Sequence, residues 1–475
     1  MKARVKQRGY ALLILIALLT TAAATVTVNA LTNNGNNQIA RDKITAAALA
    51  QAREALIGYA ITYAETHSGN VLGYLPCPDT SGTDLGGEGA AAGNCGAKNV
   101  SALGRLPWKT LDLTPLRGGD NECLWYAVSG TYKYNIKTDL MNWDTNGQLQ
   151  VYDSDGTTLL TPANNLAVAV IFAPGTAASG QDRSGTTAPE CGGNYTASNY
   201  LDSIGAFNNA TVSANANALS PFRVGDSALQ TSDRMVFVTK QDIWDAMQKR
   251  NDFLSMLDNM TLKTAECIAY FALHNNTSSN KSLPWPALLS PSNSNDYSVN
   301  TNYNDVMETY SGRVPYRVNT SHNATGNSIP SPYYLLQSDG ANCPAGWANL
   351  YPWWNNWKDH LFYGISQKYK PANNATAACD NDHCVHVNGS GNYAAVVIFA
   401  NQKLSWQTRA SNVTDPQRGI ASNYLEGRNA NYIASGHANG NENYQADTSS
   451  NTFNDTVYCI KEDLSVVKGS AAGCP

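Results

Sequence analysis

QRGYALLILIALL, residues 7–19, joins a short basic leader to a long apolar run. The leader carries four basic side chains and no acidic one, and residues 10–30 carry no charge. About 20 consecutive apolar residues are enough to cross a bilayer as a helix. Because the basic residues precede the run, we expect the leader to stay in the cytoplasm and the rest of the chain to be exported.

Three kinds of leader fit this pattern. An ordinary secretory signal would be cut after a small-residue site such as Val28-Asn29-Ala30. A simple membrane anchor would stay uncut. The third possibility is that the junction of Gly9 and Tyr10 resembles the leader of type IV prepilins and pseudopilins. In that family a prepilin peptidase cuts after the glycine and the new amino terminus is methylated, which implies processing at Gly9 and Tyr10.

A second helical pattern follows the apolar run. Residues 38–66 place apolar side chains at spacings of three and four, on one stripe of a helix: Leu49, Ala52, Leu56, Tyr59 and Tyr63. Asn33–Asn37, between the two patterns, is rich in Asn and Gly, so we expect the helix to be weak or broken there. An apolar half-helix followed by an amphipathic half-helix is similar to the plan of pilin-like proteins, where the second half packs on a head domain.

Ile14 is the fifth residue after the expected cleavage site, where shaft subunits of this family usually carry glutamate. That glutamate neutralises the amino terminus of a neighbouring subunit. A subunit without such a neighbour avoids the cost of an unpaired buried charge by lacking it. The resemblance therefore implies a position at or near a filament tip, with a shaft subunit and an ordinary anchor as alternatives.

Composition indicates an exported protein with little affinity for nucleic acid. The 475 residues are only 15% charged, the net charge is −5, and no basic patch with interleaved aromatic residues is present. The ten cysteines are an even number, which in an oxidising compartment predicts up to five disulfides. Cys379 with Cys384 and Cys459 with Cys474 are the expected short-range pairs.

The exported part contains an internal repeat. Five blocks of the first half recur in the same order in the second half, which indicates a duplicated module. The paired blocks are GRLPW 104–108 with GRVPY 312–316, LWYAVS 124–129 with LFYGIS 361–366, AVAVIFA 167–173 with AAVVIFA 394–400, ASNYL 197–201 with ASNYL 421–425, and DRMVFVTKQDI 233–243 with NDTVYCIKEDL 454–464.

We therefore predict an α+β fold with a long N-terminal transmembrane and amphipathic helix and two tandem pilin-like heads. Each head is expected to lay one helix on an antiparallel β-sheet, with Val168–Phe172 and Val396–Phe399 as the best buried strands. A single helix over residues 241–273 is expected to open the second head, because apolar residues that include Phe253, Leu257 and Met260 recur at helical spacing, with Thr264 as the one polar member of the stripe. The expected divisions are a leader at 1–9, a transmembrane anchor helix and break at 10–37, a first head at 38–248 and a second head at 249–475.

Site chemistry is sparse in the sequence. No nucleophile elbow, H-E-x-x-H helix or phosphate-binding glycine loop is present, so we do not expect an enzyme. Asp79, Asp84 and Glu88 lie in a Gly-rich loop that could hold calcium, and Asp153–Gly156 is a second acidic loop. Both lack a full calcium ladder, so plain turns are the alternative.

Two further clusters have competing interpretations. Cys379, His383, Cys384 and His386 have a spacing that could bind a metal, but a disulfide fits an oxidising compartment better. The aromatic residues of 347–357 could form either an exposed recognition surface or part of the second head's core.

The resemblance implies a structural minor pilin or pseudopilin of a type IV pilus or type II secretion filament. Its implied partners are other pilins, bound through the N-terminal helix, the prepilin peptidase and the inner membrane. The precursor would lie in the inner membrane with its heads in the periplasm, and the mature protein in a filament or on the cell surface. One alternative is an anchored or filament-borne surface adhesin or binding module. A secreted hydrolase is the weakest alternative, because no catalytic motif is present. No cofactor is expected apart from calcium in the first loop.

Overall fold

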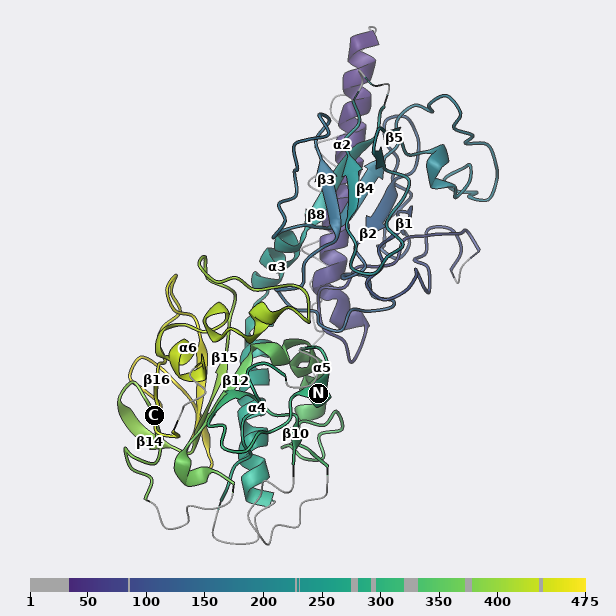
Figure 1. Cartoon of the computed structure of the whole chain (residues 1–475). Helices are drawn as coiled ribbons and strands as arrows, with labels where there is room; N and C mark the ends of the chain where they lie inside the picture. The colour runs from purple at the N-terminus through teal and green to yellow at the C-terminus, as the bar shows by residue number, and fades with distance from the viewer. Residues whose placement is uncertain are drawn as a thin grey trace, which may run out of the picture. The chain divides into compact units, whose positions relative to one another are not determined.

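The computed structural model describes residues 34–475, with side chains from residue 38, apart from residues 84–85, 227–228, 230, 275–280, 292–295, 320–331, 372–377 and 435–438. The described chain forms two compact units (Figure 1). Unit 1 contains residues 34–67, 72–138 and 146–247, and unit 2 contains residues 68–71, 139–145 and 248–475. The main division therefore follows Met247.

Unit 1 combines a long helix with a six-stranded sheet of order β1-β2-β4-β3-β7, in which β8 also pairs with β4. A separate two-stranded sheet joins β5 and β6. The elements are α2 (Asn34–Thr66), β1 (Ala102–Arg105), β2 (Trp125–Val128), β3 (Leu149–Tyr152), β4 (Ala167–Ala173), a short 3-10 helix η1 (Ala197–Asn199), β5 (Ser203–Ile204), β6 (Phe207–Asn208), β7 (Ser220–Arg223), β8 (Arg234–Thr239) and α3 (Lys240–Gln248).

Unit 2 contains a five-stranded antiparallel sheet of order β18-β17-β15-β12-β9 and two small sheets, β14-β13-β16 and β10-β11. Its helices and strands are α4 (Phe253–His274), β9 (Ser311–Arg313), β10 (Arg317–Val318), β11 (Tyr333–Tyr334), α5 (Trp347–Trp357), β12 (Leu361–Ile365), β13 (Val385–Val387), β14 (Ser390–Tyr393), β15 (Ala395–Phe399), α6 (Gly427–Ala434), β16 (Asn443–Tyr444), β17 (Thr456–Ile460) and β18 (Val466–Lys468). Five 3-10 helices are also present, at η3 (Asn300–Asn302), η5 (Lys358–His360), η6 (Gln367–Tyr369), η7 (Pro416–Gly419) and η8 (Ala421–Asn423).

Helix α2 packs on the sheet of unit 1 through the predicted stripe, along β4 and β8 (Figure 1). Ala52 and Leu56 are fully buried, and Tyr63 is almost so. The opposite face of the helix, which includes Lys43 and Glu54, is exposed. Because α2 begins at Asn34, the helix already includes most of the Asn-rich segment where we expected a break.

The second expected helix is two helices. Residues 241–273 divide into α3 and α4, separated by residues 249–252. The predicted apolar stripe of α4 is buried at Phe253, Leu257 and Met260. Its one polar member, Thr264, is also buried, and its hydroxyl donates to the Met260 carbonyl at 2.8 Å. A helical hydroxyl that bonds four residues back can therefore lie in the core without an unsatisfied donor.

The two units share one strand order. In unit 1, β1, β2, β4 and β8 lie side by side in that order, and in unit 2 β9, β12, β15 and β17 do the same. All of these pairings are antiparallel. Two of the fully buried strands, β4 and β15, carry the repeated Val-Ile-Phe sequence.

Matched hydrogen bonds extend this correspondence to single side chains. The hydroxyl of Tyr126 donates to the Pro76 carbonyl at 3.1 Å, and that of Tyr363 donates to the Pro284 carbonyl at 3.1 Å. Each unit also contains a Gln-x-Arg segment, Gln181-Asp182-Arg183 in unit 1 and Gln407-Thr408-Arg409 in unit 2, and the two guanidinium groups bind the same kinds of acceptors. Arg183 binds the carbonyls of Gly175, Asn199 and Tyr200 and the side chain of Gln181, and Arg409 binds the carbonyls of Asn401, Asn423 and Tyr424 and the side chain of Gln407.

The predicted fold class and location need correction. We expected a long transmembrane helix and a precursor in the inner membrane, but no helix within the described residues is long and apolar enough to cross a membrane. The described part of α2 carries charged residues such as Arg41, Asp42 and Lys43, which rule out a bilayer-spanning role for it. The apolar run at 10–30 lies outside the described residues. What the structure describes is a mixed α/β protein with five α-helices and several sheets.

Candidate functional site

The first predicted calcium loop uses its carboxylates for backbone contacts. Asp79 accepts hydrogen bonds from the Gly89 amide at 2.7 Å and the Tyr195 hydroxyl at 3.0 Å. Glu88 accepts from the amides of Glu190 and Cys191 at 2.6 and 2.7 Å. Asp84 lies outside the described residues. Burial raises the pKa of Asp79, which disfavours the charged form that calcium would need.

The second acidic loop is a turn. The Asp155 carboxylate accepts from the amides of Thr157 and Thr158 at 2.8 Å and from the Thr158 hydroxyl at 2.6 Å. Asp153 accepts from the Ser154 amide. These local bonds explain the acidic residues of this loop without a metal.

All ten cysteines form disulfides. Both pairs expected from the sequence, Cys379–Cys384 and Cys459–Cys474, are present. The other three bridges are Cys77–Cys95, Cys123–Cys191 and Cys267–Cys343. The bridge at Cys379 and Cys384 removes the thiolates of the possible metal site, and His383 Nδ1 instead lies 2.6 Å from Asp380. Five disulfides are typical of a protein in an oxidising compartment.

The aromatic cluster of α5 is core. Trp347 and Trp354 are fully buried, and Trp357 is 1% exposed. Trp354 stacks on Tyr316 with 5.5 Å between ring centroids. The alternative of an exposed recognition surface is therefore wrong for these rings.

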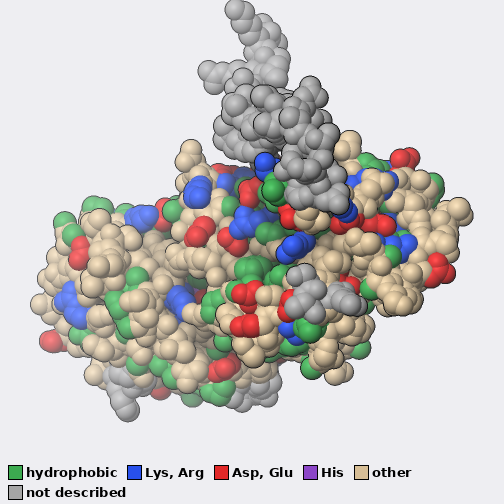
Figure 2. All heavy atoms as spheres, turned by 90° about the horizontal axis from the view of Figure 1, so that it is seen from above, with side chains coloured by type: hydrophobic (Ala, Val, Ile, Leu, Met, Phe, Trp, Pro, Cys, Tyr) green, Lys and Arg blue, Asp and Glu red, His purple; other side chains and the backbone are tan. Residues whose placement is uncertain are grey.

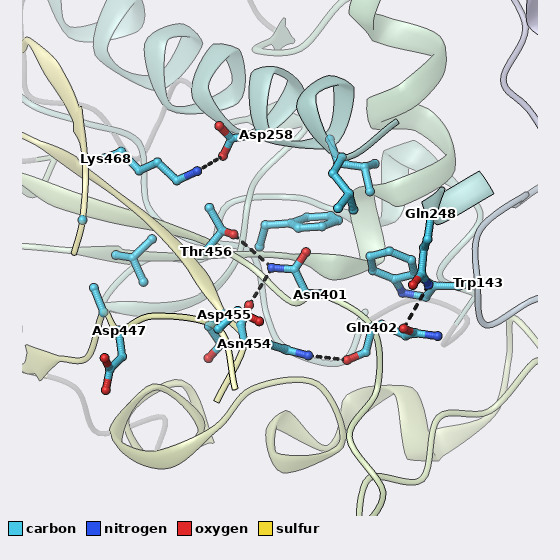
Figure 3. A pocket seen from close by; sticks show the side chains of 17 residues that line it. Trp143, Gln248, Asp258, Asn401, Gln402, Asp447, Asn454, Asp455, Thr456 and Lys468 are labelled. Atoms are coloured by element: carbon cyan, nitrogen blue, oxygen red, sulfur yellow. Dashed lines mark hydrogen bonds and ion pairs between the residues drawn. The ribbon is translucent and has the colours of Figure 1, made fainter. Parts of the chain in front are cut away.

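A cavity of about 400 Å³ lies inside unit 2, between the first turns of α4 and the ends of β15 and β17 (Figure 3). Its apolar wall is formed by side chains that include Leu257, Phe399 and Trp143. Lys468 and Asp258, which also line the cavity, form an ion pair at 2.5 Å, and both side chains are partly exposed. A cavity of this size with a few polar groups is the usual form of a small-molecule site.

Amide side chains form the polar wall of this cavity. Asn401 Nδ2 donates to the Asn454 carbonyl at 2.6 Å and to Thr456 Oγ1 at 2.9 Å, and Gln248 Nε2 donates to Gln402 Oε1 at 3.0 Å (Figure 3). The Asn454 amide nitrogen is bonded to the Gln402 carbonyl, but its buried Oδ1 has no hydrogen-bond partner among the described residues. The carboxylates of Asp258 and Asp447 also line the cavity, and a carboxylate accepts hydrogen bonds from a ligand that carries a hydroxyl or amine donor.

A buried charge network lies beside the cavity. The indole nitrogen of Trp143 donates to His360 Nε2 at 2.9 Å. His360 lies between two carboxylates, with Nε2 3.1 Å from Asp144 and Nδ1 3.1 Å from Asp359. The second oxygen of Asp359 is paired with the guanidinium of Arg418. All of these side chains except Trp143 are at most 3% exposed.

The two carboxylates of this network are held in their charged form by neighbouring groups. Burial opposes ionisation of Asp359, but His360 and Arg418 outweigh burial and hold its pKa well below the usual range. The pKa of Asp144 is lowered in the same way by His360, against the effect of burial. Both ring nitrogens of His360 are occupied by these contacts, so neither is free to activate a nucleophile.

Asp144, Asp359 and His360 are also close enough together to share a metal ion. The donor set does not fit one, because Arg418 already occupies an oxygen of Asp359 and Arg313 donates to the Asp359 carbonyl. Two buried guanidinium groups supply the positive charge that a metal would bring. The network is therefore best explained as structural.

Neither the cavity nor the buried charge network was predicted from the sequence. Asp144 is far from Asp359 in the chain. Residues 139–145 belong to unit 2, although the segments on both sides of them belong to unit 1. The repeat offered one signal for the network. His360 directly precedes the block that begins at Leu361, and the equivalent residue before the matching block at Leu124 is Cys123, so the two units differ at this place.

No family model, curated protein or solved structure matches this chain.

Charge on the surface agrees with the composition. The face shown in Figure 2 is mainly neutral, with acidic and basic side chains in small interspersed groups. A surface of this kind gives little long-range attraction for a polyanion.

Proposed function

We propose that this chain is a structural minor pilin or pseudopilin of a type IV pilus or type II secretion filament. The observation that carries the proposal is the repeated architecture, in which each unit packs one long helix on a sheet that contains four antiparallel strands in the same order. The sheet of unit 1 also contains a parallel pair, β3 and β7, so it is mixed and not antiparallel throughout as expected. A head domain with a helix packed on a sheet is what the resemblance of the leader to prepilin leaders implies. The leader residues Gly9 and Tyr10 themselves lie outside the described residues.

A position at or near the filament tip fits two features. Two units in one chain make a subunit much bulkier than a single head, and a bulky subunit is difficult to repeat along a close-packed shaft. Ile14, in the place of the usual glutamate, removes the group that would neutralise a neighbour's amino terminus. The five disulfides support heads that function outside the cytoplasm.

Filament imaging tests the proposal. Immunogold labelling of the native filaments should place this chain at filament ends, and label spread evenly along them would contradict a tip position. Gly9→Val should abolish cleavage and incorporation, whereas Ala3→Val in the same leader should change neither. Filaments that assemble normally and contain no trace of the wild-type chain would overturn the proposal.

The cavity of unit 2 favours a second candidate, a surface binding module. Its polar wall suits a small ligand with hydroxyl donors, such as a mono- or disaccharide. Calorimetric titration of the whole protein with a panel of these sugars should show binding that Asn454→Ala weakens about tenfold or more, while Asn451→Ala, at an exposed position, leaves it unchanged. Heat signals at the level of buffer for every sugar would exclude this ligand class.

A further inference from the structure

Unit 1 contains two buried carboxylic acids that hold two segments of the chain together. Asp233 is fully buried and Asp202 is 5% exposed. The amide of Asp202 donates to Asp233 Oδ2 at 2.8 Å, and the amides of Ser232 and Asp233 donate to Asp202 Oδ2 at 2.7 and 3.1 Å. These reciprocal bonds tie the segment after η1 to the segment that enters β8.

Unit 2 repeats the arrangement with Glu426 and Asp455. The Glu426 amide donates to Asp455 Oδ2 at 3.1 Å, and the amides of Asn454 and Asp455 donate to Glu426 Oε2 at 2.9 and 3.2 Å. The pair ties the segment after η8 to the start of β17. The repeat blocks align Asp233 with Asn454, but the structure gives the role of Asp233 to the next residue, Asp455.

An asparagine completes each pair. Asn209 Nδ2 donates to Asp233 Oδ2 at 2.9 Å, and Asn429 Nδ2 donates to Asp455 Oδ2 at 3.0 Å. In both units this amide also bonds the backbone of a third segment, at Arg223 and Gln445. We call the sets Asp202–Asn209–Asp233 and Glu426–Asn429–Asp455 the two carboxyl clasps.

The remaining oxygen of each aspartate needs a donor. Asp233 Oδ1 and Asp455 Oδ1 are both buried, and neither accepts a hydrogen bond from the described residues. In unit 2 Asp455 and Glu426 are likewise neighbouring carboxyl groups, since each accepts a hydrogen bond from the backbone amide of the other. Two adjacent carboxylates cannot both ionise without repulsion in a low-dielectric interior, so one proton per clasp removes this repulsion.

We propose that each unit is closed by one proton held on its carboxyl clasp, and that loss of this proton loosens the segment that enters β8 or β17. The clasp is a local pH-sensitive fastening, and it is independent of the proposed pilin function. Burial and Asp202 raise the pKa of Asp233 to about 7, which places release of the first clasp near neutral pH. Burial and Glu426 raise the pKa of Asp455 well above its ordinary value, so the second clasp shares the direction.

Other charged groups near the clasps modify this behaviour without removing it. Arg183 lowers the pKa of Asp233, but its guanidinium is also paired with Glu122 at 3.3 Å. In unit 2, Gln407, which is bonded to Arg409, donates to Glu426 Oε1 at 2.7 Å. Lys468, Asp258 and Asp447 line the cavity that Asp455 also lines.

Hydrogen exchange of the whole protein, read by mass spectrometry of peptides from residues 202–209 and 232–239, tests the first clasp. After correction for the intrinsic exchange rate, protection should fall by up to tenfold per pH unit from about pH 4 to pH 7, because the open form has lost a proton that the closed form retains. Above pH 7 it should level off. Protection that is independent of pH in the wild-type protein would overturn the proposal.

Asp233→Asn provides the matched variant, because an amide keeps the Oδ acceptor and adds a permanent donor. Its protection in the same peptides should become independent of pH, with no loss at pH 8. Asp245→Asn, at an exposed position on α3, should behave as wild type. A pH slope that survives in Asp233→Asn would contradict the proposal. Asp455→Asn, read in residues 454–460, repeats the test in unit 2 if the first variant does not fold.

Discussion

Cys123 and His360 occupy equivalent positions in the two units, each directly before the leucine that leads into the matching strand, β2 or β12. Cys123 is bonded to Cys191, whereas His360 lies between Asp144 and Asp359 in a fully buried network. Unit 1 is therefore held by a covalent bridge at a place where unit 2 is held by paired charges. The two units share the order of four strands, but they stabilise this part of the sheet by different means.

Asp359→Asn should strongly destabilise unit 2. The substitution leaves Arg418, which is 1% exposed, without its carboxylate partner. Removing one partner of a buried ion pair costs about 3–5 kcal/mol, since the other charge stays buried and uncompensated. Urea unfolding followed by tryptophan fluorescence measures this loss. Asp382→Asn, at an exposed site, is the control, and a loss for Asp359→Asn no larger than that of the control would contradict the role of the network.

The disulfides should differ in their contribution according to the loop that each one closes. Cys267–Cys343 spans 76 residues and Cys379–Cys384 spans 5. In the chain-entropy model these loops correspond to about 4.5 and about 2 kcal/mol. Paired Cys→Ala variants compared by urea unfolding should show the larger loss for Cys267 and Cys343. The reverse order would show that native contacts, not loop closure, dominate.

The first glycine of each repeated G-R-x-P block should not tolerate a side chain. A Cβ on Gly104 would lie 2.5 Å from the Asp79 carbonyl oxygen, and a Cβ on Gly312 would lie 2.1 Å from the Ala287 carbonyl oxygen. Both carbonyls are bonded to the following arginine of the block, Arg105 or Arg313, so they cannot move away freely.

Gly104→Ala and Gly312→Ala should each cost about 2 kcal/mol or more, as overpacking does. Gly93→Ala, where a Cβ meets nothing within 4 Å, is the matched control. Thermal unfolding of the three variants checks the expectation. Equal stabilities of the three variants would mean that the backbone moves to make room for a methyl group at Gly104 and Gly312.

Lys358 should make unit 2 more stable as the pH rises. Burial lowers the pKa of its amine from 10.5 to about 7, so between these values the unfolded chain binds a proton that the folded chain does not. The unfolding equilibrium constant should therefore fall by up to tenfold per pH unit across this window. Lys358→Met should remove this increase in stability, while exposed Lys403→Met should retain it. Identical pH profiles of wild type and Lys358→Met would refute the assignment.

The sequence predicted the parts of the fold that depend on local pattern. Three features follow from the spacing and type of residues along the chain. They are the apolar stripe of α2, the buried strands β4 and β15 and the two short-range disulfides. Four of the five repeat blocks form corresponding strands, and the ASNYL block forms a 3-10 helix in each unit, η1 and η8. The single helix expected at 241–273 was wrong, since periodicity does not reveal the interruption at residues 249–252.

Features that join distant segments could not be predicted. The carboxyl clasps depend on Asp202 meeting Asp233 across the loops between β4 and β8, and only the folded chain brings them together. The sequence of the loop around Asp79 and Glu88 resembles a metal site, because a sequence does not show that backbone amides bind these carboxylates. The expected membrane-spanning helix finds no counterpart in the described residues.

The N-terminal peptide of the natural mature protein tests the central claim most directly. Mass spectrometry of the chain purified with its filaments should find a first residue of methylated Tyr10, as cleavage after Gly9 requires. A chain that begins at Leu31, or one that still carries the leader, would contradict a pilin-like subunit.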